Sequence, residues 1–162
     1  MKLSDFRNEV KNSYAKYFDG SYIGIRFDPH SIYKNVKIGC YLVKDENEAI
    51  NHITSNDMFR ISFSLTKSSG EFDKSDIVDE NLILSDDLIL EKWDFSYTVK
   101  PDNKYMVYGS KGITFRKVKG TPEKMIETLD KYFKKLNEQL HDDIKNDLIH
   151  NHHIELLKKR LV

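Results

Sequence analysis

The chain has 162 residues, a length that fits one domain built around a single hydrophobic core. Its 26 basic and 26 acidic residues cancel, and this balance excludes both a uniformly basic nucleic-acid binder and a uniformly acidic nucleic-acid mimic. No apolar run is long enough to span a membrane and no signal peptide opens the chain, so we expect a soluble, cytoplasmic protein with no membrane partner.

Residues 1–20 carry the pattern of one amphipathic helix. Ser4 is the expected N-cap, because a serine side chain can accept a hydrogen bond from the first helical turn. Gly20 stands where a glycine commonly ends a helix. The apolar residues recur at steps of three and four, so they share one face of the helix: Leu3, Phe6, Val10, Tyr14 and Tyr17.

Between residues 21 and 120 the apolar pattern changes to alternation, which predicts an antiparallel sheet of five to seven strands with one buried face. A short helix is expected at 45–53, and an acidic loop at 67–87. The alternating segments are 22–27, 36–42, 59–65, 93–99, 105–108 and 113–118. The last three are expected to form a meander with a turn at 109–112.

Residues 121–162 are expected to be helical, which makes the whole chain a single-domain α+β fold. Thr121 is a typical N-cap, and Pro122 suits the first turn because its missing N–H has no partner there. The apolar stripe weakens near Asn151, so one long helix and two helices broken there both fit. This stripe needs a cover, either the sheet or a second copy of the chain in a homodimer. It runs through Met125, Leu129, Phe133, Leu136, Leu140 and Ile144.

Charge is distributed unevenly along this neutral chain. Residues 45–94 contain 13 acidic and four basic residues, a net charge of −9. Residues 100–119 contain six basic residues and one acidic residue, a net charge of +5. Two arrangements fit: the stretches face each other or the solvent within one molecule, or one of them steers a charged partner toward a docking surface.

The leading hypothesis is a non-enzymatic binding protein that inhibits a host nucleic-acid enzyme by protein–protein contact, in the manner of anti-CRISPR or anti-restriction inhibitors. The chain is small, and its 21 Lys, 15 Ile and 11 Asn against two Ala indicate the AT-rich coding typical of low-GC bacteria and their phages. Carboxylates of the acidic loop would then contact Lys and Arg of the partner in place of phosphates. The candidate partner-binding residues are Glu71, Asp73, Asp76, Asp79, Glu80, Asp86 and Asp87.

An alternative hypothesis is a nucleic-acid-binding accessory protein that uses the basic stretch. Positive charge interleaved with aromatic rings on a sheet suits single strands, because the phosphates take the charge and the bases stack on the rings. Such binding would weaken steeply with salt. The candidate residues are Lys100, Lys104, Lys111, Arg116, Lys117 and Lys119.

A third hypothesis, a metal-dependent hydrolase, depends on Asp143, Asp147 and His150. On a continuous helix these residues would share one face. A solvated helix surface explains them better, so we assign no metal site, no cofactor and no catalytic residue. Cys40 alternates inward with Ile38 and is predicted to be a buried, unreactive thiol, and as the single cysteine it excludes an internal disulfide.

Overall fold

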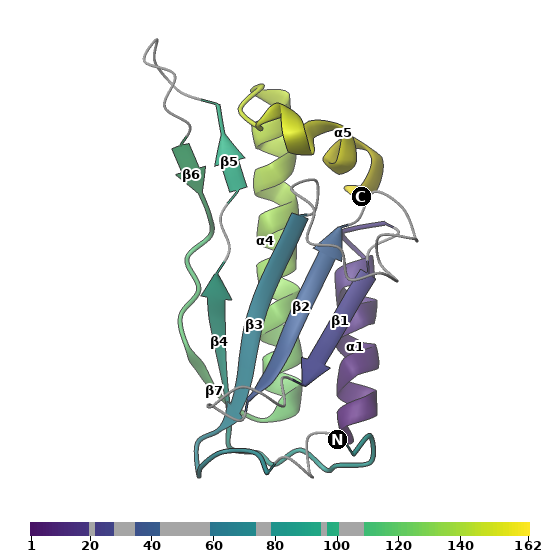
Figure 1. Ribbon diagram of the computed structural model, residues 1–162, viewed down its shortest axis with the longest axis vertical. Coiled ribbons are helices and arrows are strands. Elements are labelled where there is room, and N and C mark those ends of the chain that lie inside the picture. The colour runs from purple at the N-terminus through teal and green to yellow at the C-terminus, as the bar shows by residue number, and fades with distance from the viewer. Residues whose placement is uncertain (20–21, 28–34, 43–58, 74–78, 95–96, 101–108) are drawn as a thin grey trace.

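A computed structural model describes residues 1–19, 22–27, 35–42, 59–73, 79–94, 97–100 and 109–162. The α+β class with an antiparallel sheet is confirmed. Helices α1 (Leu3–Ala15) and α4 (Pro122–Lys145) lie side by side against one face of the sheet, and α5 (Asn151–Arg160) lies near the end of α4 (Figure 1). In the part of the chain that is described, no helix is both long enough and apolar enough to cross a membrane.

The sheet has the strand order β1-β2-β3-β4-β7, and every neighbouring pair is antiparallel. Only four of these strands, β1 to β4, are longer than three residues, and β7 adds three residues at the edge; counted by the longer strands, the prediction of five to seven is not confirmed. The strands are β1 (Tyr22–Phe27), β2 (Val36–Leu42), β3 (Phe59–Lys67), β4 (Leu88–Asp94) and β7 (Val118–Gly120).

A separate two-stranded ribbon is formed by β5 (Tyr97–Val99) and β6 (Gly109–Lys111). It extends beyond the end of β4, next to α4 (Figure 1). The predicted turn at 109–112 is therefore wrong, because residues 109–111 pair with β5. The predicted strand at 105–108 and the predicted helix at 45–53 lie outside the described residues.

The predicted strand at 113–118 is also wrong, since only its last residue joins a strand, β7. The alternation there has a different cause. The ring of Phe115 packs 5.4 Å from that of Phe63, and Lys92 donates a 2.6 Å hydrogen bond to the Ile113 carbonyl. Side-chain packing on the core thus produces a period of two without the regular hydrogen bonds of a strand.

The apolar stripe of α4 is buried inside its own chain. Met125, Leu129 and Phe133 have no exposed surface, and α1 and the sheet cover them. Phe63 of β3 meets Tyr132 and Phe133 of α4 with ring centroids 5.3 and 6.3 Å apart. A homodimer is therefore not needed to cover this stripe, contrary to one of the two alternatives left open by the sequence.

The boundaries of α4 decide between the one-helix and two-helix alternatives. Thr121 caps the helix as predicted, with its hydroxyl accepting a 3.2 Å hydrogen bond from the Lys124 N–H. The helix ends at Lys145, and Asp147 then adopts a left-handed conformation with φ of 56°. The segment therefore forms two helices, and the second, α5, begins at Asn151.

The start of α1 differs from the prediction, because Lys2 and not Ser4 precedes its first turn and provides no side-chain cap. The N–H groups of Leu3 and Ser4 instead donate to the carbonyls of Leu82 and Glu80, at 2.8 and 3.2 Å. Carbonyls of the acidic loop thus satisfy the donors that a cap would otherwise satisfy.

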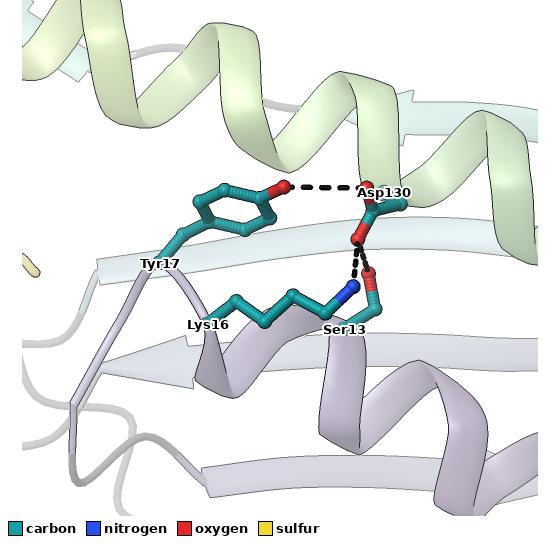
Figure 2. A network of polar contacts seen from close by, with 4 residues as sticks. All are labelled: Ser13, Lys16, Tyr17 and Asp130. Carbon is teal, nitrogen blue, oxygen red and sulfur yellow. Dashed lines mark hydrogen bonds and ion pairs between the residues drawn. The ribbon is translucent and has the colours of Figure 1, made fainter.

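A polar network joins the end of α1 to the middle of α4 (Figure 2). The Asp130 carboxylate accepts hydrogen bonds from the Ser13 hydroxyl at 2.7 Å, the Lys16 ammonium at 3.1 Å and the Tyr17 hydroxyl at 3.2 Å. The first two donors share Oδ1, and the third binds Oδ2. These contacts join the end of α1 to α4 and so help to hold the two helices together against the sheet.

Candidate functional site

The acidic loop is firmly attached to the body of the protein. Phe72 is buried, and the Lys67 ammonium at the end of β3 lies 5.3 Å from the centre of its ring. Leu84 is buried as well, and its N–H donates a 2.9 Å hydrogen bond to the Met1 carbonyl. The N–H of Ser68 donates to the Asp87 carbonyl at 2.6 Å. The described parts of this loop, 67–73 and 79–87, therefore have a defined shape.

Some of the predicted partner-binding carboxylates hold the loop itself. Asp79 accepts a 2.9 Å hydrogen bond from the Asn81 N–H, and Glu80 forms a 2.6 Å ion pair with Arg7 of α1. Asp87 accepts a 3.0 Å hydrogen bond from the N–H of Ser69, and hydrogen bonding from the Ser69 side chain lowers the pKa of Asp87 to about 2. These three acids have structural partners within the chain.

Three other predicted partner-binding acids lie on the surface. Glu71, Asp73 and Asp86 are exposed, while Asp76 lies outside the described residues. Between them on the chain lies Ile83, whose surface is 64% exposed. This isoleucine was not predicted, although the triplet Leu82-Ile83-Leu84 carries a signal for it. In an extended segment that buries Leu84, the neighbouring side chain must turn outward.

The candidate nucleic-acid-binding residues are largely paired with acids. The Lys111 ammonium lies 2.7 Å from an Asp143 oxygen, and the Lys100 ammonium lies 2.7 Å from an Asp147 oxygen. A third basic candidate pairs with an acid of β4, at 3.1 Å: Lys117 with Glu91. Arg116 and Lys119 are exposed, and Lys104 lies outside the described residues.

Asp143 is a buried acid at the centre of a polar cluster. Its side chain is 3% exposed, and its two oxygens accept hydrogen bonds from Tyr97 of β5 and Lys111 of β6. Gln139, one turn earlier on α4, donates a 2.6 Å hydrogen bond to the Tyr97 hydroxyl. Burial, together with the hydrogen bond to Asp143, raises the pKa of that hydroxyl well above its ordinary value. Both oxygens of the carboxylate are occupied, so it is poorly placed to act as a general base.

The third hypothesis placed Asp143 on one helical face with Asp147 and His150. The structure separates them, because α4 ends at Lys145 and the chain turns at Asp147. The Lys100 ammonium lowers the pKa of Asp147 through a hydrogen bond. Within the described residues, no group of three or more His, Cys, Asp or Glu side chains is placed to hold a metal ion. Cys40 is buried as predicted, and burial raises the pKa of its thiol.

A surface hollow of about 440 Å³ lies beside the Asp143 cluster. Both ammonium and carboxylate groups line this hollow. The lining residues are Lys111, Ile113, Lys135, Glu138, Gln139, Asp142 and Asp143. This mixture favours no single charge class of ligand.

Comparisons with protein-family models, curated proteins and solved structures find no match for this chain. The function of this protein is therefore inferred from the residues described above.

Proposed function

We propose that this protein is a non-enzymatic binding protein, encoded by a phage or mobile element, that inhibits a host nucleic-acid enzyme by protein–protein contact. The acidic loop, residues 67–87, would occupy a basic groove of the partner that otherwise binds phosphates. One observation carries the proposal: a loop fixed by buried Phe72 and Leu84 presents exposed carboxylates together with the exposed side chain of Ile83.

Each part of this surface suits binding. The described segments 67–73 and 79–87 already have a defined shape and lose little conformational freedom in a complex, so more of the contact energy appears as affinity. Exposed carboxylates at Glu71, Asp73 and Asp86 accelerate association with a basic surface. Burial of Ile83 adds apolar contact, which stabilises the complex once it has formed.

The two other hypotheses receive less support from the structure. The nucleic-acid alternative uses Lys100, Lys111 and Lys117, whose charges are each matched by a carboxylate of the same chain. The hydrolase hypothesis uses Asp143 and Asp147, which are the partners of two of these lysines. An ammonium group whose charge is matched by a neighbouring carboxylate attracts phosphates less strongly than an unmatched one does.

The proposal can be tested with a charge-neutralised variant carrying Glu71→Gln, Asp73→Asn and Asp86→Asn. The matched control carries Glu127→Gln, Glu138→Gln and Glu155→Gln, which remove the same charge from exposed positions on α4 and α5. Each protein is immobilised and exposed to a bacterial lysate, and bound proteins are eluted with duplex DNA.

We expect the wild type and the control to retain a nucleic-acid enzyme that DNA displaces, because protein and DNA would compete for one basic groove. The loop variant should not retain it. The proposal is wrong if the loop variant and the wild type retain the same proteins, or if DNA displaces none of them.

A further inference from the structure

We propose that the β5–β6 ribbon opens away from α4 as a unit of its own, and that Asp143 is the residue that holds it closed. The ribbon consists of Tyr97–Val99 paired with Gly109–Lys111 and is not part of the five-stranded sheet. A two-stranded ribbon is marginally stable by itself, so its position depends on what it contacts. This inference is independent of the proposed binding function.

Asp143 contacts both strands of the ribbon at one point. Tyr97 and Lys111 are direct partners in the β5–β6 register, and each donates a hydrogen bond to a different oxygen of the Asp143 carboxylate. Gln139 of α4 adds a hydrogen bond to the Tyr97 hydroxyl. A single carboxylate on α4 thus fixes the first residue pair of the ribbon.

The far end of β5 is fixed by polar contacts as well. The N–H of Lys100 donates a 2.6 Å hydrogen bond to the Leu148 carbonyl, and its ammonium pairs with Asp147 at 2.7 Å. Apolar contact comes from the buried Tyr97 ring, whose centre lies 6.5 Å from that of Phe59. The described attachment of the ribbon therefore combines one buried ring, that of Tyr97, with polar contacts at both ends of β5.

Among the side chains whose burial the structure describes, opening the ribbon exposes one large buried ring, that of Tyr97, whereas β2 and β3 each bury four apolar side chains. When the ribbon lifts, the Asp143 carboxylate and the Lys111 ammonium regain water, and this hydration offsets much of the lost attraction between them. The apolar side chains that β2 and β3 bury gain no such favourable hydration when they are exposed. We therefore infer that the ribbon opens without unfolding of the sheet, as a local unit of lower stability.

Amide hydrogen exchange measured by NMR tests this inference on the intact chain. In the wild type, amides of residues 97–100 and 109–111 should exchange at least about 100-fold faster than those at the centres of β2 and β3, after correction for intrinsic rates. Asp143→Asn removes the charge that both strands contact, and it should accelerate ribbon exchange by a further 10- to 100-fold or so. Exchange in β2 and β3 should not change.

Asp130→Asn is the matched control, because Asp130 is also an α4 carboxylate with three side-chain donors but holds α1 instead of the ribbon. It should leave ribbon exchange unchanged. Lys111→Met removes one partner from the ribbon side and should accelerate ribbon exchange even if Asp143→Asn does not fold. The inference is overturned if ribbon amides of the wild type exchange as slowly as those of β2 and β3. It is also overturned if Asp143→Asn, or Lys111→Met in its place, accelerates all three regions by the same factor.

Discussion

Replacing Asp130 by Asn should lower the free energy of unfolding by about 2 kcal/mol, because hydrogen bonds to a charged acceptor contribute about 1.5–3 kcal/mol. Ser13, the nearest donor at 2.7 Å, is almost fully buried and would lose a charged partner. Lys16 contributes little, since its side chain is 61% exposed and exposed ion pairs contribute at most about 1 kcal/mol. An asparagine amide would also direct a donor toward the Tyr17 hydroxyl, which now donates to Asp130 (Figure 2).

Glu127→Gln supplies the comparison from the same helix. Glu127 forms a 2.7 Å ion pair with Lys131, but both side chains are exposed and lie four residues apart. Its loss should leave the free energy of unfolding nearly unchanged. Urea unfolding followed by circular dichroism measures both values, and the Asp130 variant should also melt about 4–8 °C lower.

The pH dependence of the Asp130 effect has a defined sign. Burial acts to raise the pKa of Asp130, but hydrogen bonds from Ser13 and Lys16 outweigh it, so the pKa lies below its ordinary value. A carboxyl group whose pKa is lowered by folding stabilises the folded protein at pH values above its pKa in the unfolded chain, about 4. This contribution disappears as the pH falls through the pKa of the folded state. The difference in the free energy of unfolding between wild type and variant should therefore be greatest at pH 7 and shrink below about pH 4. A loss of under about 0.5 kcal/mol at pH 7 would refute the assigned role of this network.

Three further outcomes are expected. Ser69→Ala should move the pKa of Asp87 from about 2 toward its ordinary value in an NMR titration, and an unchanged pKa would contradict the assigned cause. In the wild type, the stability linked to this lowered pKa should be present above about pH 4 and disappear as the pH falls through 2. Thr121→Ala should cost about 1 kcal/mol in urea unfolding, because the Lys124 N–H loses its cap, and a neutral result would mean that the cap contributes nothing. Phe133→Ala should cost about 3–5 kcal/mol, since the ring is fully buried, and a loss below about 1 kcal/mol would show that the core lies elsewhere.

The elements with strong local patterns could be predicted from the sequence. The stripe of α1, the alternation of β1 to β3 and the Thr121-Pro122 start of α4 all appear close to where the pattern placed them. In these segments, the residues that decide the structure lie within a few positions of one another. The buried state of Cys40 followed from the same alternation.

The ribbon could not be predicted, because its structure depends on distant residues. Tyr97 and Lys111 meet an acid 46 and 32 residues further along the chain, and no local period records that contact. The helix α4 ends at Lys145 and is followed by the left-handed turn at Asp147, whereas the apolar pattern left open whether one helix or two would form there. Alternation at 113–118 was mistaken for a strand because packing on a core produces the same period.

The candidate site was predictable as a charged region but not as a set of individual roles. Glu80 looked like the other acids of the loop, yet its partner Arg7 lies 73 residues earlier in the chain. Likewise, the net charges of the acidic and basic stretches could not show that Lys111 and Asp143 would meet. Such pairing depends on how the elements are arranged in space, and only the fold shows which charges remain exposed.

The most direct test of the proposed function is the association rate with the purified partner, measured at 50 and 200 mM salt. The variant carrying Glu71→Gln, Asp73→Asn and Asp86→Asn should associate at least about 10-fold more slowly than the wild type at low salt, with its dissociation rate little changed. Ile83→Ser should show the opposite pattern, a faster dissociation at an unchanged association rate. An association rate equal to that of the wild type for the charge variant at both salt concentrations would contradict the proposal that the acidic loop docks on a basic partner.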